Sequence, residues 1–175
     1  TNKVLDKDGW FDTGDLGMLL PDGSVVLTGR AKDTIVLSSG ENIEPGPLEE
    51  CLLASPLVEQ VMLVGQDQKQ LGALVVPREQ SLMEWAQNKK LNLIDELSLF
   101  PGEESLRKNL RSELNLLLAE RPGSRPDERL IGVALVKPIT IENGLLTQTL
   151  KQRRNIISER DSSSVEAIYG RESFA

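Results

Sequence analysis

The segment from Gly29 to Pro45, with the sequence GRAKDTIVLSSGENIEP, limits the fold more than any other part of this 175-residue chain. One apolar run ends at Gly29, a short charged stretch follows, and a second apolar run begins at Thr34. The small, turn-forming residues 38–42 close that run, and Pro47 suits the first turn of a helix because its missing N–H would have no partner there. The segment therefore predicts a strand, a solvated joint, a second strand, a tight loop and a helix.

The remaining elements follow from apolar periodicity, which predicts an α+β fold. Two apolar runs joined by Pro21-Asp22-Gly23 predict a β-hairpin within residues 17–29. After the joint, the expected order is a helix at 47–54, strands at 58–64 and 71–76, helices at 78–90 and 103–121, a strand at 130–136 and a short basic helix at 147–159. Residues 89–100 are ambiguous, and only one helical turn, 165–169, is expected before a frayed end. We expect a small mixed or antiparallel sheet packed with helices and preceded by a β-hairpin.

The composition excludes several classes of function. A net charge of −7 and a pI near 4.8 argue against an evenly spread nucleic-acid surface, and the nearest approach to a basic patch is Lys151, Arg153, Arg154 and Arg160. Because the chain has no histidine, it cannot build a His-ligated metal site or a Ser-His or Cys-His nucleophile. The single Cys51 cannot form an internal disulfide, and its apolar neighbours predict a buried thiol. We expect no nucleic-acid partner and no hydrolase that depends on histidine.

No metal site, membrane span or signal peptide is expected from the sequence. Asp6 and Asp8 begin like a calcium-binding loop, but Trp10 stands where the third ligand should be. No apolar run approaches the ~20 residues of a membrane-spanning helix, and the first residues lack the apolar segment of a signal peptide. We therefore expect a soluble protein of a reducing compartment. The polar start without a methionine also predicts a piece of a longer chain.

Three sequence blocks resemble one enzyme superfamily, in the same order and with similar spacing. They are WFDTGDLG at 10–17, GRAKDTIVLSSGENIEPGPLEE at 29–50 and NGLLTQTLKQRR at 143–154. The middle block resembles the joint between the large and small domains of adenylate-forming enzymes, which comprise acyl-CoA synthetases, luciferases and peptide-synthetase adenylation domains. The three blocks span almost the whole chain. Their amino-acid sequences are most similar to those of the long-chain fatty-acid branch, which includes the acyl-acyl-carrier-protein synthetases of plants and cyanobacteria.

The resemblance implies an acid–thiol ligase that works in two half-reactions. The carboxylate of a long-chain fatty acid would first attack the α-phosphate of ATP, in the presence of Mg²⁺, to give an acyl-adenylate and pyrophosphate. A thiol of CoA, or of the phosphopantetheine arm of an acyl carrier protein, would then displace AMP. Because both transition states gather negative charge on oxygen atoms, such a catalyst needs fixed cations and N–H donors at those oxygens. The choice between CoA and a carrier protein stays open.

The resemblance also implies roles for three residues in the first half-reaction. Asp15 matches the aspartate that accepts hydrogen bonds from the ribose hydroxyls, and a carboxylate suits a diol because it offers acceptors only. Arg30 matches the arginine that reaches the ribose and phosphate side of the nucleotide. Lys151 aligns with the lysine that bridges the carboxylate and α-phosphate oxygens, where a compact ammonium can touch both reactants. Many members have glycine before that lysine, whereas this chain has Leu150, as long-chain relatives with a bulky residue do.

The second half-reaction involves two further places in the chain. Lys32 matches the hinge about which the small domain swings between the two half-reactions. The loop at residues 38–42 would face the active site during thiol transfer. There Gly40 would let a slender pantetheine arm pass without a Cβ in its way, and Glu41 lies beside it.

The implied domain division places residues 1–30 at the end of a large N-terminal domain and residues 31–175 in a small mobile domain. The family's phosphate loop and acyl pocket belong to the large domain, and neither such a loop nor GxxxxGK[ST] occurs here. We therefore expect the missing domain as a partner and as the main holder of Mg²⁺. The resemblance implies a location in the cytoplasm or the plastid stroma and is compatible with peripheral membrane association. A stand-alone regulatory or binding module without catalysis is the alternative left open.

Overall fold

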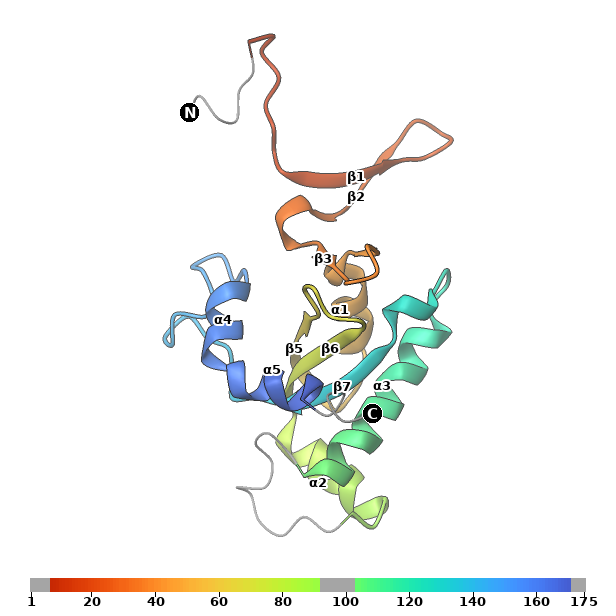
Figure 1. Cartoon of the computed structure of the whole chain (residues 1–175), viewed down its shortest axis with the longest axis vertical. Helices are drawn as coiled ribbons and strands as arrows, with labels where there is room; N and C mark the ends of the chain where they lie inside the picture. Colours follow the sequence, from red (N-terminus) through yellow and green to blue (C-terminus); the bar gives the residue numbers. More distant parts are fainter. Residues whose placement is uncertain (1–6, 92–102, 171–175) are drawn as a thin grey trace.

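The computed structural model describes residues 7–91 and 103–170 (Figure 1). A hairpin of β1 (Asp15–Leu19) and β2 (Val25–Arg30) leads through the 3-10 helix η1 (Ala31–Asp33) to a two-stranded ladder of β3 (Ile35–Val36) and β4 (Asn42–Ile43). The other elements are α1 (Pro45–Leu53), β5 (Val58–Val64), β6 (Leu71–Pro77), α2 (Glu79–Asn88), α3 (Glu104–Glu120), η3 (Pro126–Glu128), β7 (Leu130–Leu135), α4 (Arg154–Arg160) and α5 (Ser162–Tyr169). This is the α+β fold expected from the sequence, a small mixed sheet packed with helices and preceded by a hairpin.

The central sheet has the strand order β5-β6-β7 and separates two cores. Strands β5 and β6 pair antiparallel, and β6 pairs with β7 in parallel, so the sheet is mixed. All residues of β6 are buried, as expected for a central strand covered on both faces. Because side chains alternate along a strand, Ala73 and Val75 point into one core, whereas Leu74 and Val76 point into the other.

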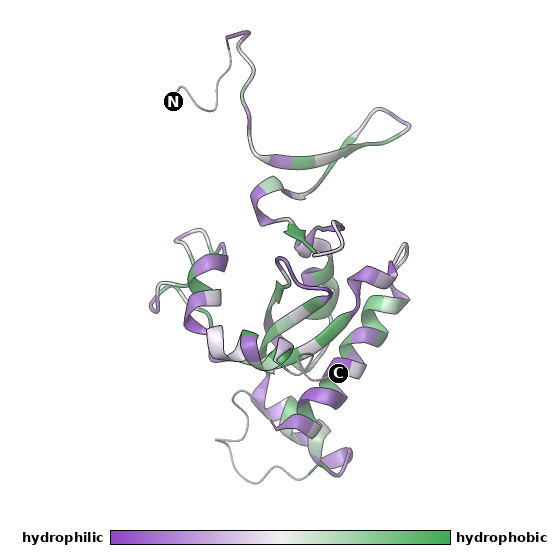
Figure 2. Ribbon diagram, in the orientation of Figure 1, coloured by the Kyte–Doolittle hydropathy of each residue, from purple (hydrophilic) through white to green (hydrophobic). Residues whose placement is uncertain are grey.

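Helices α1, α2 and α3 cover one face of this sheet. The buried stripe of α3 consists of leucines four residues apart, at positions 106, 110, 114 and 118. Burying each leucine contributes roughly 1.5–3 kcal/mol, so this stripe is a main source of stability. Figure 2 shows the helices with mixed polar and apolar residues and the central strands mostly apolar. Of the helices described, none combines the length and apolar character that crossing a membrane requires.

Helices α4 and α5 cover the opposite face, so the prediction of a single turn at 165–169 was too short. Ile168 of α5 lies over Gly72 and Gly132, which are partners across β6 and β7. A Cβ at Gly72 would come within 2.8 Å of Ile168 Cγ2, and one at Gly132 within 2.9 Å. The Tyr169 hydroxyl lies 3.0 Å from the Val64 carbonyl oxygen, and burial raises the pKa of this tyrosine. The two glycines therefore make the notch into which α5 packs. Residues 171–175, expected to be frayed, lie outside the described ranges.

The β1–β2 hairpin projects from one end of the molecule and exposes apolar side chains (Figure 1). Leu19, Val25 and Leu27 are each at least 64% exposed. Trp10, Phe11, Met18 and Val26 are also classed as exposed. A two-stranded hairpin has marginal stability by itself. The other described residues therefore do not account for its exposed apolar surface.

The loop between β3 and β4 is a three-residue turn that ends in a glycine. The Gly40 N–H donates to the Leu37 carbonyl at 2.8 Å, and the Leu37 N–H donates to the Glu41 carbonyl at 2.9 Å. Gly40 takes φ +88°, in the left-handed region where residues with a Cβ are disfavoured. A turn followed by one left-handed residue is a common three-residue hairpin loop. The backbone of this loop therefore requires the glycine.

The loop at residues 148–150 has the same geometry but ends in a leucine. The Leu150 N–H donates to the Thr147 carbonyl at 2.9 Å, and the Thr147 N–H donates to the Lys151 carbonyl at 2.9 Å. Leu150 has φ +60°, which costs a residue other than glycine about 1–2 kcal/mol. The helix expected at 147–159 is thus wrong in its first half, because this loop occupies the residues before α4 begins at Arg154.

Candidate functional site

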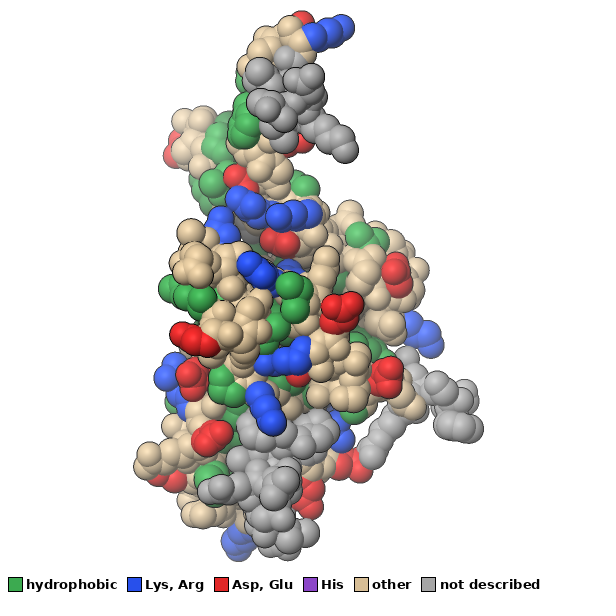
Figure 3. All heavy atoms as spheres, turned by 90° about the vertical axis from the view of Figure 1, so that its left-hand side faces the viewer, with side chains coloured by type: hydrophobic (Ala, Val, Ile, Leu, Met, Phe, Trp, Pro, Cys, Tyr) green, Lys and Arg blue, Asp and Glu red, His purple; other side chains and the backbone are tan. Residues whose placement is uncertain are grey.

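A pocket of about 760 Å³ brings together three residues that the sequence singled out. Arg30 and Lys32 line it from the joint after the hairpin, and Lys151 lines it from the loop before α4. Figure 3 shows Lys and Arg side chains gathered on the face that carries α4. In the part of the chain that the structure describes, neither the Lys32 nor the Lys151 ammonium group has an ion-pair partner. An anion that enters this pocket would therefore meet cations from two distant stretches of the sequence.

The Lys151 loop is anchored along the outer edge of β5. The Gln152 side chain donates to the Val61 carbonyl at 3.0 Å, and Arg154 donates to the Leu63 carbonyl at 2.7 Å. Further along the same edge, the Gln60 side chain donates to the Ile139 carbonyl at 2.8 Å and accepts from the Ile139 N–H at 2.9 Å. The Gln152 and Arg154 contacts satisfy two carbonyl groups that the edge strand β5 would otherwise leave open. They also fix the base of the loop while its tip stays exposed.

Asp15 and Arg30 form an ion pair at the end of the hairpin. They are partners across β1 and β2, and Arg30 Nε lies 3.0 Å from Asp15 Oδ1. Their side chains are 26% and 38% exposed, so the pair contributes little stability, on the order of 0.2–1 kcal/mol. Arg30 lines the pocket, whereas Asp15 is not one of its lining residues. The arrangement leaves the second carboxylate oxygen of Asp15 available as an acceptor.

Gly40 and Glu41 do not line this pocket. Their loop is held from two sides, because the Ser38 N–H donates to the Gln68 carbonyl at 2.9 Å and Arg125 donates to the Asn42 carbonyl at 3.2 Å. A Cβ at Gly40 would meet nothing within 4 Å. Within this chain, the glycine is thus required by its backbone angle. The passage of a pantetheine arm beside it stays a prediction.

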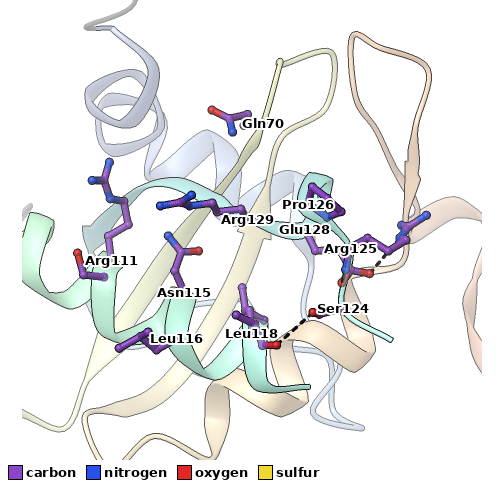
Figure 4. A pocket seen from close by; sticks show the side chains of 12 residues that line it. Gln70, Arg111, Asn115, Leu116, Leu118, Ser124, Arg125, Pro126, Glu128 and Arg129 are labelled. Atoms are coloured by element: carbon purple, nitrogen blue, oxygen red, sulfur yellow. Dashed lines mark hydrogen bonds and ion pairs between the residues drawn. The ribbon is translucent and has the colours of Figure 1, made fainter. Parts of the chain in front are cut away.

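A second pocket of about 720 Å³ lies between α3, η3 and the start of β7 (Figure 4). Its buried carboxylate, Glu128, contacts the guanidinium groups of Arg121 and Arg125 and accepts from the Arg125 N–H at 2.9 Å. Burial raises the pKa of Glu128, but these hydrogen bonds and the Arg121 charge outweigh burial and hold the pKa below its ordinary value. Arg111 and Arg129 also line the pocket, and neither has a carboxylate partner among the described residues.

The sequence did not single out Glu49, although it positions the candidate site. Glu49 accepts from the Leu63 N–H at 2.7 Å and lies 2.9 Å from Arg154 Nη2. Arg154 had been noted only as part of a basic block. One sequence signal could have indicated this role. Glu49 directly follows Leu48, which is buried on the sheet-facing side of α1, and a carboxylate near a buried face needs hydrogen-bond or ion-pair partners.

Comparison with known proteins identifies the family. Residues 32–98 match the model of the AMP-binding enzyme C-terminal domain. These residues belong to this domain family of adenylate-forming enzymes. The chain is 37% identical, over 97% of its length, to the probable acyl-activating enzyme 16, chloroplastic, of Arabidopsis thaliana, and 34% identical, over 97%, to a chloroplastic long-chain-fatty-acid–[acyl-carrier-protein] ligase of the same organism. It is also 33% identical, over 97%, to the long-chain-fatty-acid–CoA ligase 1 of Homo sapiens.

The chain spans about a quarter of the length of these three relatives: 24%, 22% and 24%, respectively. Its fold matches the A domain of carboxylic acid reductase from Segniliparus rugosus, solved in complex with AMP and a co-purified carboxylic acid, with a TM-score of 0.80 and 28% identity. That match covers 98% of this chain and 25% of the solved one. The fold expected from the resemblance is therefore confirmed.

Proposed function

We propose that this chain is the C-terminal part of an ATP-dependent acid–thiol ligase that activates a long-chain fatty acid as its acyl-adenylate. The observation that carries the proposal is the convergence of Arg30, Lys32 and Lys151 on one pocket. Its cations suit the anionic reactants of this chemistry, which are a carboxylate and the phosphates of ATP. Two relatives, a long-chain-fatty-acid–[acyl-carrier-protein] ligase and a long-chain-fatty-acid–CoA ligase, support the substrate class.

In the first half-reaction, Lys151 would bridge the fatty-acid carboxylate and the α-phosphate. Its ammonium stands on a loop that is anchored at its base and exposed at its tip, and it has no ion-pair partner among the described residues, as a mobile catalytic cation requires. Arg30 would contact the phosphate and ribose side, and the free oxygen of Asp15 would accept from a ribose hydroxyl. Mg²⁺ would enter with ATP and be held mainly by its phosphates and by the rest of the longer protein.

We propose that residues 1–30 complete a preceding large domain and that residues 31–175 form the mobile domain. The exposed apolar residues of the hairpin support this division, because a larger domain would cover them. The joint between the two parts is η1, which contains Lys32. A rotation at this joint would carry the Lys151 loop away from the reactants after the adenylate has formed.

In the second half-reaction, the loop with Gly40 and Glu41 would face the incoming thiol. The acceptor is either CoA or the phosphopantetheine arm of an acyl carrier protein, and relatives bear names of both kinds. The second pocket adjoins this loop through the contact of Arg125 with Asn42. Arg111 and Arg129 in that pocket lack carboxylate partners in the described ranges 7–91 and 103–170, and they would suit the acceptor's negative charge. The two Arabidopsis thaliana relatives are chloroplastic proteins, which favours the plastid stroma as the compartment of this chain; the cytoplasm is the alternative.

The deciding experiment is ATP–pyrophosphate exchange with a long-chain fatty acid. We expect exchange by the complete protein and none by the 175-residue chain alone, because the chain supplies only part of the nucleotide contacts. Robust exchange by the chain alone would contradict the domain division. A complete protein that binds AMP but never exchanges pyrophosphate would favour the non-catalytic binding module. Supplying CoA and a carrier protein separately to the acyl-adenylate would then identify the acceptor.

A further inference from the structure

Leu150 occupies a backbone position that disfavours leucine, and it leaves its side chain in solvent. It has φ +60° and is 69% exposed. The loop at 38–40 makes the same pair of hydrogen bonds with Gly40 in the equivalent place, so the loop does not need a side chain there. A leucine that is neither buried nor suited to its backbone adds nothing to the stability of this arrangement.

The other described non-glycine residues with positive φ have local explanations. Asp67 (φ +61°) carries a short polar side chain that accepts a hydrogen bond from Gln66 at 3.1 Å. Lys90 (φ +55°) follows the end of α2, where the Leu91 N–H donates to the Ala86 carbonyl and the Lys90 N–H to the Gln87 carbonyl, both at 2.9 Å. Those two bonds are the usual termination of a helix by a left-handed residue. Leu150 has neither a polar side chain nor a helix end to account for it.

The position of Leu150 next to Lys151 indicates at which stage of the reaction its side chain would make a contact. It precedes Lys151, and its loop neighbours Gln148 and Thr149 are uncharged. The tip of the loop is therefore a neutral surface with one large apolar group beside a free ammonium. A residue held in a disfavoured backbone conformation beside a candidate catalytic group is a reason to look for a function there.

We propose that Leu150 is a docking residue, buried against an apolar surface of the preceding domain when Lys151 enters the active site. The proposal rests on the function proposed above. We choose the preceding domain as the partner surface because the chain spans only about a quarter of the length of its relatives. The other three quarters of such a protein would supply the surface. The hairpin residues Leu19 and Leu27, 71% and 69% exposed, are also left uncovered by the described part of the chain. If Leu150 is buried only when Lys151 is in the active site, that burial shifts the population of the protein toward this arrangement.

The test compares Leu150→Gly with Leu150→Met and with Leu53→Ala, the last being a control at a 44% exposed leucine on α1 that lines neither pocket. In the 175-residue chain, Leu150→Gly should raise the melting temperature by roughly 2–4 °C, because glycine removes the backbone strain. In the complete protein it should slow ATP–pyrophosphate exchange about tenfold, because the buried contact is lost. Thioester formation from supplied acyl-adenylate should not change. Leu150→Met should keep most of the exchange rate, and Leu53→Ala should leave the exchange rate unchanged.

A readout independent of catalysis separates this proposal from the proposed function. Hydrogen–deuterium exchange of residues 147–152 in the complete protein should slow when a non-hydrolysable ATP analogue is added, and it should slow less in Leu150→Gly. Protection without any pyrophosphate exchange would sink the ligase function but keep the docking contact. No protection in the wild type, or full pyrophosphate exchange by Leu150→Gly, would overturn the contact. A loss confined to long acids and absent with a short one would also overturn it, since Leu150 would then touch the acyl chain.

Discussion

Arg154 of α4 binds Glu49 of α1 through two contacts, with Nη1 3.2 Å from Oε2 and Nη2 2.9 Å from Oε1. Both residues also bind Leu63 of β5, the glutamate through the N–H and the arginine through the carbonyl. Their side chains are only 14% and 19% exposed. The contact joins the helix after the 38–42 loop to the helix after the Lys151 loop. It therefore sets the relative position of the two loops that the proposed half-reactions use.

Removing either partner should destabilise the fold. Arg154→Ala should lower the free energy of unfolding by about 3 kcal/mol, since it leaves a largely buried carboxylate unpaired, and Glu49→Ala should behave similarly. The double variant should lose about 1–3 kcal/mol less than the sum. Urea unfolding measures all three. Arg153→Ala, an exposed neighbour, is the control and should stay within about 0.5 kcal/mol of the wild type. Additive losses would show that the two residues act separately.

Lys151→Ala in the complete protein should impair one half-reaction only. Removing a positioned charge at a transition-state oxygen typically costs ~10²–10³ in rate, so pyrophosphate exchange should fall by that factor. Thioester formation from synthetic long-chain acyl-AMP and the thiol acceptor should change little. Lys151→Arg should rescue poorly, because a broad fork does not fit a point-charge position. Loss of both half-reactions with an unchanged circular dichroism spectrum would refute this assignment.

Lys32→Pro should spare adenylate formation and strongly slow thioester formation in the complete protein. Proline fixes φ near −65° and removes an N–H, which obstructs a backbone rotation at η1. Lys32→Arg is the matched control and should change neither rate, because it keeps both the positive charge in the pocket and the backbone freedom at the proposed pivot. Ala31 also lies in η1, and a helical residue before proline is disfavoured, so circular dichroism must accompany the kinetics. Equal losses in both half-reactions would make Lys32 a structural residue.

Glu128 should give stability that depends on pH. Its pKa is lowered in the fold, so its contribution is present above the ordinary value of 4.5 and is lost as the pH falls through the lower folded value. Glu128→Gln should lower the free energy of unfolding by about 1–3 kcal/mol at neutral pH, and the difference should shrink in acid. Urea unfolding between about pH 7 and pH 3 measures this, with the exposed Glu120→Gln as control. A difference that is the same at every pH would exclude the carboxylate charge as its cause.

The elements with strong periodicity could be predicted, and those that depend on tertiary contacts could not. The leucines of α3 and the apolar runs of β5 and β6 carry their own signal in the sequence. The notch for α5 could not be found, because Gly72 and Gly132 become a pair only through the register of β6 with β7. The loop before α4 was mistaken for helix because nothing local in TQTLKQRR reveals a positive φ at Leu150.

The candidate site divides in the same way. Asp15, Arg30, Lys32 and Lys151 were chosen from a resemblance, and their roles stay predictions. Their mutual arrangement needed the structure: the hairpin register pairs Asp15 with Arg30, and the anchoring of residues 152 and 154 on β5 brings Lys151 to the pocket. Glu49 was overlooked because its partner Arg154 stands at the other end of the chain.

The parallel pairing of β6 with β7 also determines an order of events in folding. β5 and β6 are joined by the short turn 65–70 and can pair early, whereas β7 joins only after the long segment 78–129 has been closed. Until then, the apolar strand LGALVVP has one open edge, which is a template for pairing with another chain. A chain that stops before Leu130 should therefore aggregate rather than fold into a smaller domain, and during synthesis this edge stays open until β7 has emerged from the ribosome.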